Sequence, residues 1–198
     1  RRSAPASAPA EAAALIEASA NSTHTEREAK AVLSLYGVPV VGERLVGSAA
    51  EAGRAATELG LPVALKVESP DLPHKTEAGV IRLNLRSAAE VEQAFAQVMA
   101  NADKVSPPPR INGVLGQPMV PTGAEIMVGA RVDPPFGPLV VVGLGGILLE
   151  LLKDTQVAVA PVAPSEARAM LERLKGARLL QGFRGSAPVD LDRLAEVV

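Results

Sequence analysis

Residues 61–85 read LPVALKVESPDLPHKTEAGVIRLNL, and this stretch predicts two neighbouring β-strands joined by a stiff, charged loop. Residues 61–67 form an apolar run, and residues 80–85 alternate apolar with polar side chains, as half-buried strands do. Two prolines restrict the backbone of the loop, and Gly79 permits the turn into the second strand. The stretch therefore predicts part of a sheet that presents ionisable side chains on one connecting loop.

Helices and strands alternate on both sides of this stretch. Thr25 and Glu28 have the spacing of a capping box, which predicts the start of a helix, and Ser48 and Ser87 are predicted to cap two more. Further strands are predicted at 38–46, 111–120, 124–132, 138–144 and 155–162, and further helices at 165–174 and from 191 onward. Alternating helices and strands followed by a mostly antiparallel sheet indicate the α+β class.

The composition excludes several classes of function. Lys and Arg number 20 and Asp and Glu 22, so a net charge of -2 gives no general attraction to nucleic acid or an anionic membrane. Aromatic residues are only 2% of the chain, which excludes the stacking surfaces of single-strand-binding proteins. The chain has no cysteine and hence no disulfide, thiolate metal ligand or cysteine nucleophile, which fits a reducing compartment. We expect a cytoplasmic location.

The ends of the chain and its longest uncharged run also carry information. The uncharged run between Asp133 and Glu150 is shorter than the roughly 20 apolar residues of a spanning helix, and it contains prolines and glycines. Residues 1–22 are dominated by Ala, Ser and Pro, which predicts an interdomain linker that could contain a short helix within AEAAALIEA. The absence of an initiator methionine suggests a cut inside a longer protein.

The loop after residue 66 holds the densest cluster of reactive side chains. Lys66 ends an apolar strand, where a lone ammonium is costly unless an anion meets it. His74, Lys75 and Thr76 add an imidazole, a second ammonium and a hydroxyl. Two lysines on such a loop can hold a polyphosphate, and a histidine between them can accept a phosphoryl group. The alternative is a surface loop whose charges are merely solvated, and the spacing alone leaves both open.

Three long segments resemble the ATP-grasp part of NDP-forming acyl-CoA synthetases, relatives of succinyl-CoA synthetase and of ADP-forming acetyl-CoA synthetase. They are TEREAKAVLSLYGVPV (25–40), KVESPDLPHKTEAGV (66–80) and QPMVPTGAEIMVGARVDPPFGPLVVVGLGGILLELLKDTQVAVAP (117–161). The resemblance covers about residues 22–198. It implies an α+β ATP-grasp fold with two α/β subdomains.

The resemblance also implies where the subdomains lie. The small subdomain is expected over residues 23–110 and an incomplete larger one over residues 111–198. In the family, a strand bearing Asn-Pro and a later aspartate supply the magnesium ligands, and we expect these beyond Val198. The metal ligands therefore stay unassigned. Asp133, Glu150 and Asp154 are expected to be solvated carboxylates at strand ends.

On the phosphate side, the resemblance implies roles for four residues. Lys66 matches the lysine that meets the nucleotide phosphates, and Pro73 and Lys75 belong to the loop that closes over them. His74 matches a histidine that carries the phosphoryl group to ADP. The competing interpretation of His74 is a loop histidine without a chemical role.

On the base side, the resemblance implies a hinge and an acidic residue. Gln117 to Val120 match the hinge whose backbone meets adenine, and Glu125 matches the residue that meets the ribose hydroxyls, although it could simply face water. Gln117 replaces a glutamate of succinyl-CoA synthetase, which puts nucleotide selectivity in doubt. Val80 replaces a second glycine after Gly79, which suggests a stiffer phosphate loop.

These matches predict the nucleotide-binding ATP-grasp segment of an ADP-forming acyl-CoA synthetase, an acid–thiol ligase. It would couple acyl-CoA formation to ATP and ADP through a phosphohistidine relay, with ATP/ADP and Mg²⁺ as cofactors. Its partners would be the CoA-binding and ligase domains of the same or a partner chain, and neither nucleic acid nor a membrane. One alternative is an acyl-CoA-synthetase-like regulatory domain fused to a lysine acetyltransferase. Another is a biosynthetic ligase that forms carboxylate–amine bonds.

Overall fold

The structure is a computed structural model, and it contains two compact units, residues 1–120 and residues 121–198. Each unit has its own sheet and its own apolar core. The residues that the structure describes are 7–19, 23–72, 75–121, 123–146, 151–182 and 187–198.

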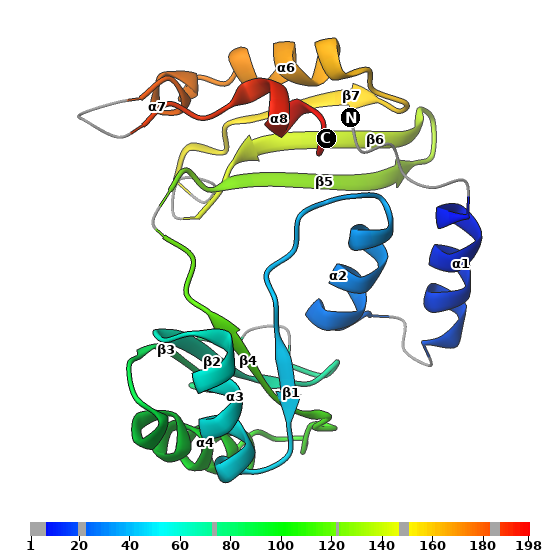
Figure 1. Cartoon of the computed structure of the whole chain (residues 1–198). Helices are drawn as coiled ribbons and strands as arrows, with labels where there is room; N and C mark the ends of the chain where they lie inside the picture. Colours follow the sequence, from blue (N-terminus) through cyan, green and yellow to red (C-terminus); the bar gives the residue numbers. More distant parts are fainter. Residues whose placement is uncertain (1–6, 20–22, 73–74, 122, 147–150, 183–186) are drawn as a thin grey trace. The chain divides into compact units, whose positions relative to one another are not determined.

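The first unit is built on a four-stranded antiparallel sheet with the order β1-β4-β2-β3 (Figure 1). Side chains of Thr25, Ser48 and Ser87 accept backbone hydrogen bonds at the N-termini of three helices, as their spacing predicts. The elements are α1 (Ala8–Ala18), α2 (Glu26–Leu35), β1 (Arg44–Val46), α3 (Ala49–Leu59), β2 (Val63–Glu68), β3 (Ile81–Leu85), α4 (Ala88–Ala102) and β4 (Gly113–Pro118).

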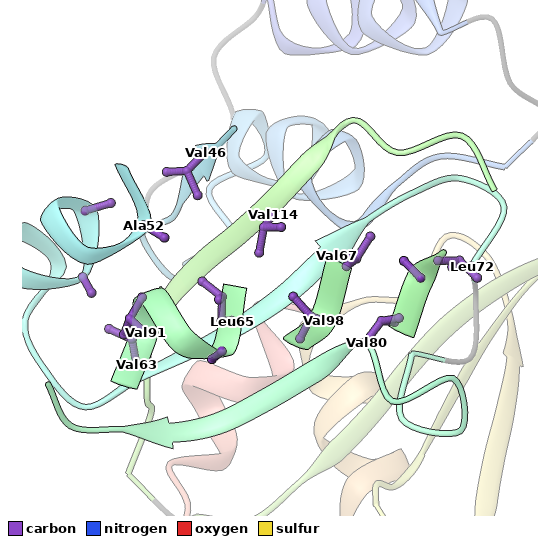
Figure 2. Packing of buried hydrophobic residues seen from close by; sticks show 14 residues of the cluster. Val46, Ala52, Val63, Leu65, Val67, Leu72, Val80, Val91, Val98 and Val114 are labelled. Atoms are coloured by element: carbon purple, nitrogen blue, oxygen red, sulfur yellow. The ribbon is translucent and has the colours of Figure 1, made fainter. Parts of the chain in front are cut away.

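Strand β2 separates the core of this unit from the face that carries its polar side chains. Val63, Leu65 and Val67 are buried and pack with side chains of α3 and α4, as Figure 2 shows for the cluster around them. Successive side chains of a strand point to opposite faces of the sheet. Lys66 and Glu68 therefore point away from this core.

The second unit is a three-stranded antiparallel sheet with the order β5-β6-β7. Val142 and Leu144 of the central strand pack in the core with Met170 and Leu171. The elements are β5 (Ile126–Asp133), β6 (Gly137–Leu144), β7 (Thr155–Val159), α6 (Pro164–Glu172), α7 (Ala177–Leu180) and α8 (Leu191–Ala195).

The α+β prediction is confirmed, and most elements lie where the sequence predicts them. The strand predicted at 38–46 is wrong in length, because only Arg44–Val46 pair with β4. The short helix α7 was not predicted, while α1 occupies the stretch where a short helix was suggested.

Strand β4 pairs with β1 and β2, so the first unit extends to Val120. The subdomain limits at residues 110 and 111 stay a prediction. Within the described residues, no helix is long and apolar enough to cross a membrane.

Candidate functional site

The pairing of β2 with β4 brings two of the expected ligand-binding residues to one face of the sheet. Ala64 lies directly opposite Gln117, and Lys66 lies opposite Leu115. Directly opposed residues of antiparallel strands share a face, and their diagonal neighbours are within reach of long side chains. Lys66 and Gln117 are therefore neighbours on the face opposite the core, and both are largely buried.

The carboxylate of Glu26, in the first turn of α2, joins these two side chains. Lys66 Nζ donates to Glu26 Oε1 at 2.7 Å and to Oε2 at 2.6 Å, and Gln117 Nε2 donates to Oε1 at 3.1 Å. Lys30, one helical turn later, places its Nζ 2.6 Å from the same Oε1. Glu43 accepts from Lys30 Nζ at 2.9 Å and from Gln117 Nε2 at 2.7 Å. We call these five side chains the Glu26 cluster.

The charges of the Glu26 cluster offset one another. Burial acts to raise the pKa of Glu26, but hydrogen bonds from Lys30, Lys66 and Gln117 outweigh it and lower the pKa from 4.5 to about 2. Burial likewise acts to lower the pKa of Lys30, but its hydrogen bonds to Glu26 and Glu43 raise it above its usual value. Glu26 and Lys30 are therefore charged at neutral pH.

A second buried carboxylate fixes the same helical turn to β2. Glu68, only 2% exposed, accepts from Thr25 Oγ1 at 2.9 Å and from Arg27 Nε at 3.1 Å. Thr25 also caps α2, since its Oγ1 accepts from the Glu28 backbone while the Glu28 side chain accepts from the Thr25 backbone. Both Lys66 and Glu68 thus hold the start of α2 against the sheet.

The loop between β2 and β3 is attached to the rest of the unit near its first residues. The Asp71 carboxylate accepts from the Arg110 side chain at 2.8 Å and 3.0 Å, and from the Arg110 backbone at 2.8 Å. Asp71 N also donates to Ser69 Oγ at 3.0 Å. These hydrogen bonds from Arg110 lower the pKa of Asp71 from 3.8 to about 2. Pro73 and His74 lie outside the described residues.

The far end of the same loop is a turn that closes on the core. Gly79 has a φ of +66°, and its carbonyl accepts from Asn101 Nδ2 at 2.9 Å and from an Arg82 guanidinium nitrogen at 3.1 Å. Val80 is fully buried in the core, which is why a glycine would be a poor substitute at this position. Lys75 Nζ lies 3.4 Å from the Leu72 carbonyl oxygen.

Val120 and Glu125 are the predicted binding residues nearest the boundary between the two units in the sequence. Val120 is 63% exposed at the end of the first unit, and the exposed Glu125 belongs to the second unit. Gly145 N donates to the Glu125 carbonyl at 2.6 Å, and Gly146 lies against the Glu125 carboxylate. The glycine run therefore allows the backbone after β6 to approach the start of β5 closely.

The described carboxylates do not assemble a metal site. Among the described residues, no three His, Cys, Asp or Glu side chains form a cluster that could hold a metal ion. The expectation that Asp154 is solvated is wrong, because it is 3% exposed and accepts from the backbone N–H groups of Lys175 and Gly176 at 3.0 Å and 2.8 Å. Asp133 pairs with Arg131 at 3.0 Å. Glu150 lies outside the described residues.

Three members of the cluster were not singled out from the sequence: Glu26, Lys30 and Glu43. The four-residue spacing of Glu26 and Lys30 is the one feature of the sequence that points to any of them. It indicates an ordinary ion pair on a helix surface rather than a binding site. The contacts that join Glu26 and Glu43 to Lys66 and Gln117 link positions 40 to 91 residues apart, and Lys30 meets Glu43 13 residues away. No local pattern reports such distant contacts.

Residues 15–198 match the family described as ATP-grasp domain. The chain is 41% identical over 173 residues to a 4-hydroxybutyrate–CoA ligase [ADP-forming] of Nitrosopumilus maritimus, covering 87% of this chain and 25% of the relative. It is 39% identical over 173 residues to the acetate–CoA ligase [ADP-forming] I subunit beta of Pyrococcus furiosus, covering 75% of that subunit. The chain thus spans a quarter of one relative and three quarters of the other.

Solved structures give the same picture. A dinucleotide-forming acetyl-coenzyme A synthetase 1 of Ca. Korarchaeum cryptofilum, in complex with coenzyme A, Ca-AMPCP and HgCl⁺, aligns with a TM-score of 0.88 and 38% identity. The alignment covers 97% of this chain and 83% of that chain. A second structure of this synthetase, with coenzyme A and Mg-AMPPCP, has its phosphohistidine segment pointing towards the nucleotide binding site. It aligns with a TM-score of 0.77 and 37% identity, covering 92% of this chain and 79% of that chain.

Proposed function

This chain belongs to the ATP-grasp domain family, among the relatives of ADP-forming acyl-CoA ligases, and from this premise we propose that it is the nucleotide-binding segment of an acid–thiol ligase. The whole protein would couple formation of an acyl-CoA to the interconversion of ATP and ADP. The observation that carries the proposal is Lys66, a largely buried ammonium held beside Gln117 on one face of the sheet.

Lys66 supplies what a phosphate site requires from the protein. Within the described residues, Glu26 accepts two of the three N–H bonds of its ammonium, which leaves one for a phosphate oxygen. A positive charge in a largely dehydrated position interacts strongly with an anion. We assign the nucleotide phosphates to Lys66, with Lys75 on the adjoining loop as the second cation.

Gln117 to Val120 would meet the nucleobase and Glu125 the ribose hydroxyls. Gln117 directs its amide nitrogen at Glu26 and Glu43, so its side-chain carbonyl is the group left for a ligand. The described residues offer no cluster for magnesium, and we assign none of them to the metal. We propose that magnesium enters with the nucleotide, and the related synthetase solved with Mg-AMPPCP supports this.

His74 would act as the phosphoryl carrier at this site. In the proposed step, its imidazole nitrogen attacks the phosphorus of a phosphohistidine from the CoA-binding part; one P–N bond forms while the other breaks. His74 then passes the group to a β-phosphate oxygen of ADP, so that a P–O bond replaces the P–N bond and ATP results. Lys66 and Lys75 would stabilise the negative charge of the transferred group. The phosphohistidine segment of the related synthetase supports such a route.

The partners follow from the size of the relatives. Some are β subunits and others are single chains about four times as long as the matched region. We propose that this chain works with CoA-binding and ligase domains of the same or a partner chain, in the cytoplasm.

The proposal is tested by phosphoryl labelling of the whole protein that contains this chain. The protein is incubated with γ-labelled ATP and magnesium, and the label is mapped to peptides. We expect acid-labile, base-stable label on the peptide with His74, and its loss from that peptide in His74→Ala. His24, the other histidine of the chain, provides a matched control, since His24→Ala should retain the label.

Two results would contradict the carrier role. Label that persists on this peptide in His74→Ala would assign the phosphoryl group to another side chain. A protein that binds ATP but never acquires label would favour the regulatory alternative, an acyl-CoA-synthetase-like domain fused to a lysine acetyltransferase.

A further inference from the structure

Glu26 makes more contacts to the proposed phosphate site than any role in helix formation requires. A glutamate in the first turn of a helix is ordinarily favourable through the helix dipole alone. Here the carboxylate also receives N–H groups from Lys66 on β2, Gln117 on β4 and Lys30 on its own helix. Three donors from three elements converge on one side chain.

We propose that Glu26 is a positioning residue, which holds the Lys66 ammonium at the place and in the orientation that a nucleotide phosphate requires. The inference rests on the proposed function, because it takes the phosphates as the ligand of Lys66. Glu26 itself does not touch the ligand. It acts through Lys66.

The first support is the geometry of the pair. Lys66 Nζ lies 2.7 Å from one Glu26 oxygen and 2.6 Å from the other, so the carboxylate holds the ammonium with both oxygens. A lysine side chain has four rotatable bonds and pays considerable entropy when a ligand fixes it. A lysine that is already fixed by Glu26 avoids most of this cost when phosphate binds.

The second support is that Glu26 cannot easily withdraw. Its neighbours Thr25 and Arg27 both donate to Glu68, a buried carboxylate two residues from Lys66 on the same strand. The first turn of α2 is thereby attached to β2 on both sides of Glu26. A carboxylate that competed with phosphate for Lys66 would need freedom to move away, and this anchoring argues against it.

The third support is the balance of charge. Glu26 and Glu43 carry two negative charges, and Lys30 and Lys66 two positive ones. Lys30 pairs with both carboxylates and so reduces the attraction that Glu26 alone would exert on Lys66. Lys66 is held in place by hydrogen bonds and yet keeps a charge that can attract a phosphate.

Glu26→Gln tests the inference with little change in shape. A glutamine has only one acceptor oxygen, and its NH₂ group would face the donors of Lys66 and Gln117. We expect the affinity for ADP, measured by calorimetric titration of the protein, to fall by about tenfold or more. Glu28→Gln is the matched control, because it removes a charge from the same turn while glutamine still serves a capping box. It should leave the affinity within about twofold of the unmodified protein.

A double-mutant cycle with Lys66→Met separates positioning from a general structural effect. If Glu26 acts through Lys66, the Glu26→Gln change should have no further effect on ADP affinity once Lys66 is gone. Additive losses would overturn the inference. So would an ADP affinity of Glu26→Gln that equals or exceeds that of the unmodified protein, since Glu26 would then be either irrelevant or a competitor.

A measurement without nucleotide distinguishes this inference from the proposed function. Reductive methylation with formaldehyde, followed by mass spectrometry, reports how readily each lysine reacts. Lys66 should react several times faster in Glu26→Gln, while the exposed Lys175 serves as the internal reference. Equal Lys66 rates in the two proteins would overturn the positioning role. Failure of the unmodified protein to bind ADP would instead overturn the proposed function.

Discussion

Single residues decide how the segments of this protein approach one another, and the glycines after β6 illustrate this. A Cβ atom on Gly145 would lie 2.9 Å from the backbone carbonyl carbon of Glu125 and 3.0 Å from its Cβ atom. Real side chains do not tolerate such distances to a backbone atom, so one of the two segments would have to move. The close approach therefore requires glycine at this position.

We expect Gly145→Ala to reduce the free energy of unfolding by about 1–3 kcal/mol, because the added methyl group would collide with the backbone of Glu125. Gly123→Ala is the matched control, since a Cβ atom on Gly123 would have no other atom within 4 Å. That variant should be neutral or slightly stabilising, as a loop glycine replaced by alanine loses unfolded-state entropy. Urea denaturation of both variants measures the difference. Equal stabilities would mean that the two segments adjust without cost.

At the scale of whole elements, α2 shows which features of a helix local sequence predicts and which it does not. The capping box and the start of the helix were correctly predicted, because both depend on residues within one turn. None of the ten residues of this helix is buried. The helix is held on β2 by charged and polar side chains instead. The pairing of the strands determines which charged side chains meet. The local spacing of residues in the sequence does not predict that pairing.

In the candidate site, too, some residues could be found from the sequence and others could not. Lys66 and Gln117 were recognised from long segments of sequence, and the structure brings them together through the register of β2 and β4. Glu43 could not be found, because it lies in a stretch predicted as strand that is mostly irregular. All the assigned roles stay predictions, namely those of Lys66, Pro73, His74, Lys75, Gln117, Val120 and Glu125.

The ion pair of Asp71 and Arg110 links two connecting segments of the first unit, and its removal should be visible through pH. In Arg110→Ala we expect the pKa of Asp71 to rise from about 2 towards 3.8, as followed by NMR titration. Because the pKa of folded Asp71 lies below that of the unfolded chain, the pair stabilises the fold above about pH 3.8. This contribution disappears as the pH falls towards 2.

Arg110→Lys is the control for this prediction. It keeps the positive charge but cannot form the paired hydrogen bonds of a guanidinium, so the pKa of Asp71 should take an intermediate value. A pKa of Asp71 that stays at about 2 in Arg110→Ala would show that another group lowers it.

At the scale of the whole molecule, the described residues of the two units pack in separate cores that share no residue. Leu65→Ala, at a position 1% exposed in the first core, should cost about 2–5 kcal/mol of unfolding free energy. Leu83→Ala, at a position 55% exposed on the adjacent strand, should cost less than about 1 kcal/mol. Hydrogen exchange should show lost amide protection in β2 and β4 of the Leu65 variant, with β5 to β7 unaffected. An equal loss in both units would show that they unfold as one.

Lys66 and Glu68 lie two positions apart on β2, and this spacing determines where α2 packs along the strand. Lys66 pairs with Glu26, and Glu68 pairs with Arg27, the next residue of the helix. The order of charges on the strand therefore matches the order of opposite charges on the helix. A helix shifted along the strand would bring Glu26 against Glu68, and two carboxylates repel each other. The two strand residues therefore fix the register of α2 on β2. They favour one position of the helix and disfavour the neighbouring one, although no side chain of the helix is buried.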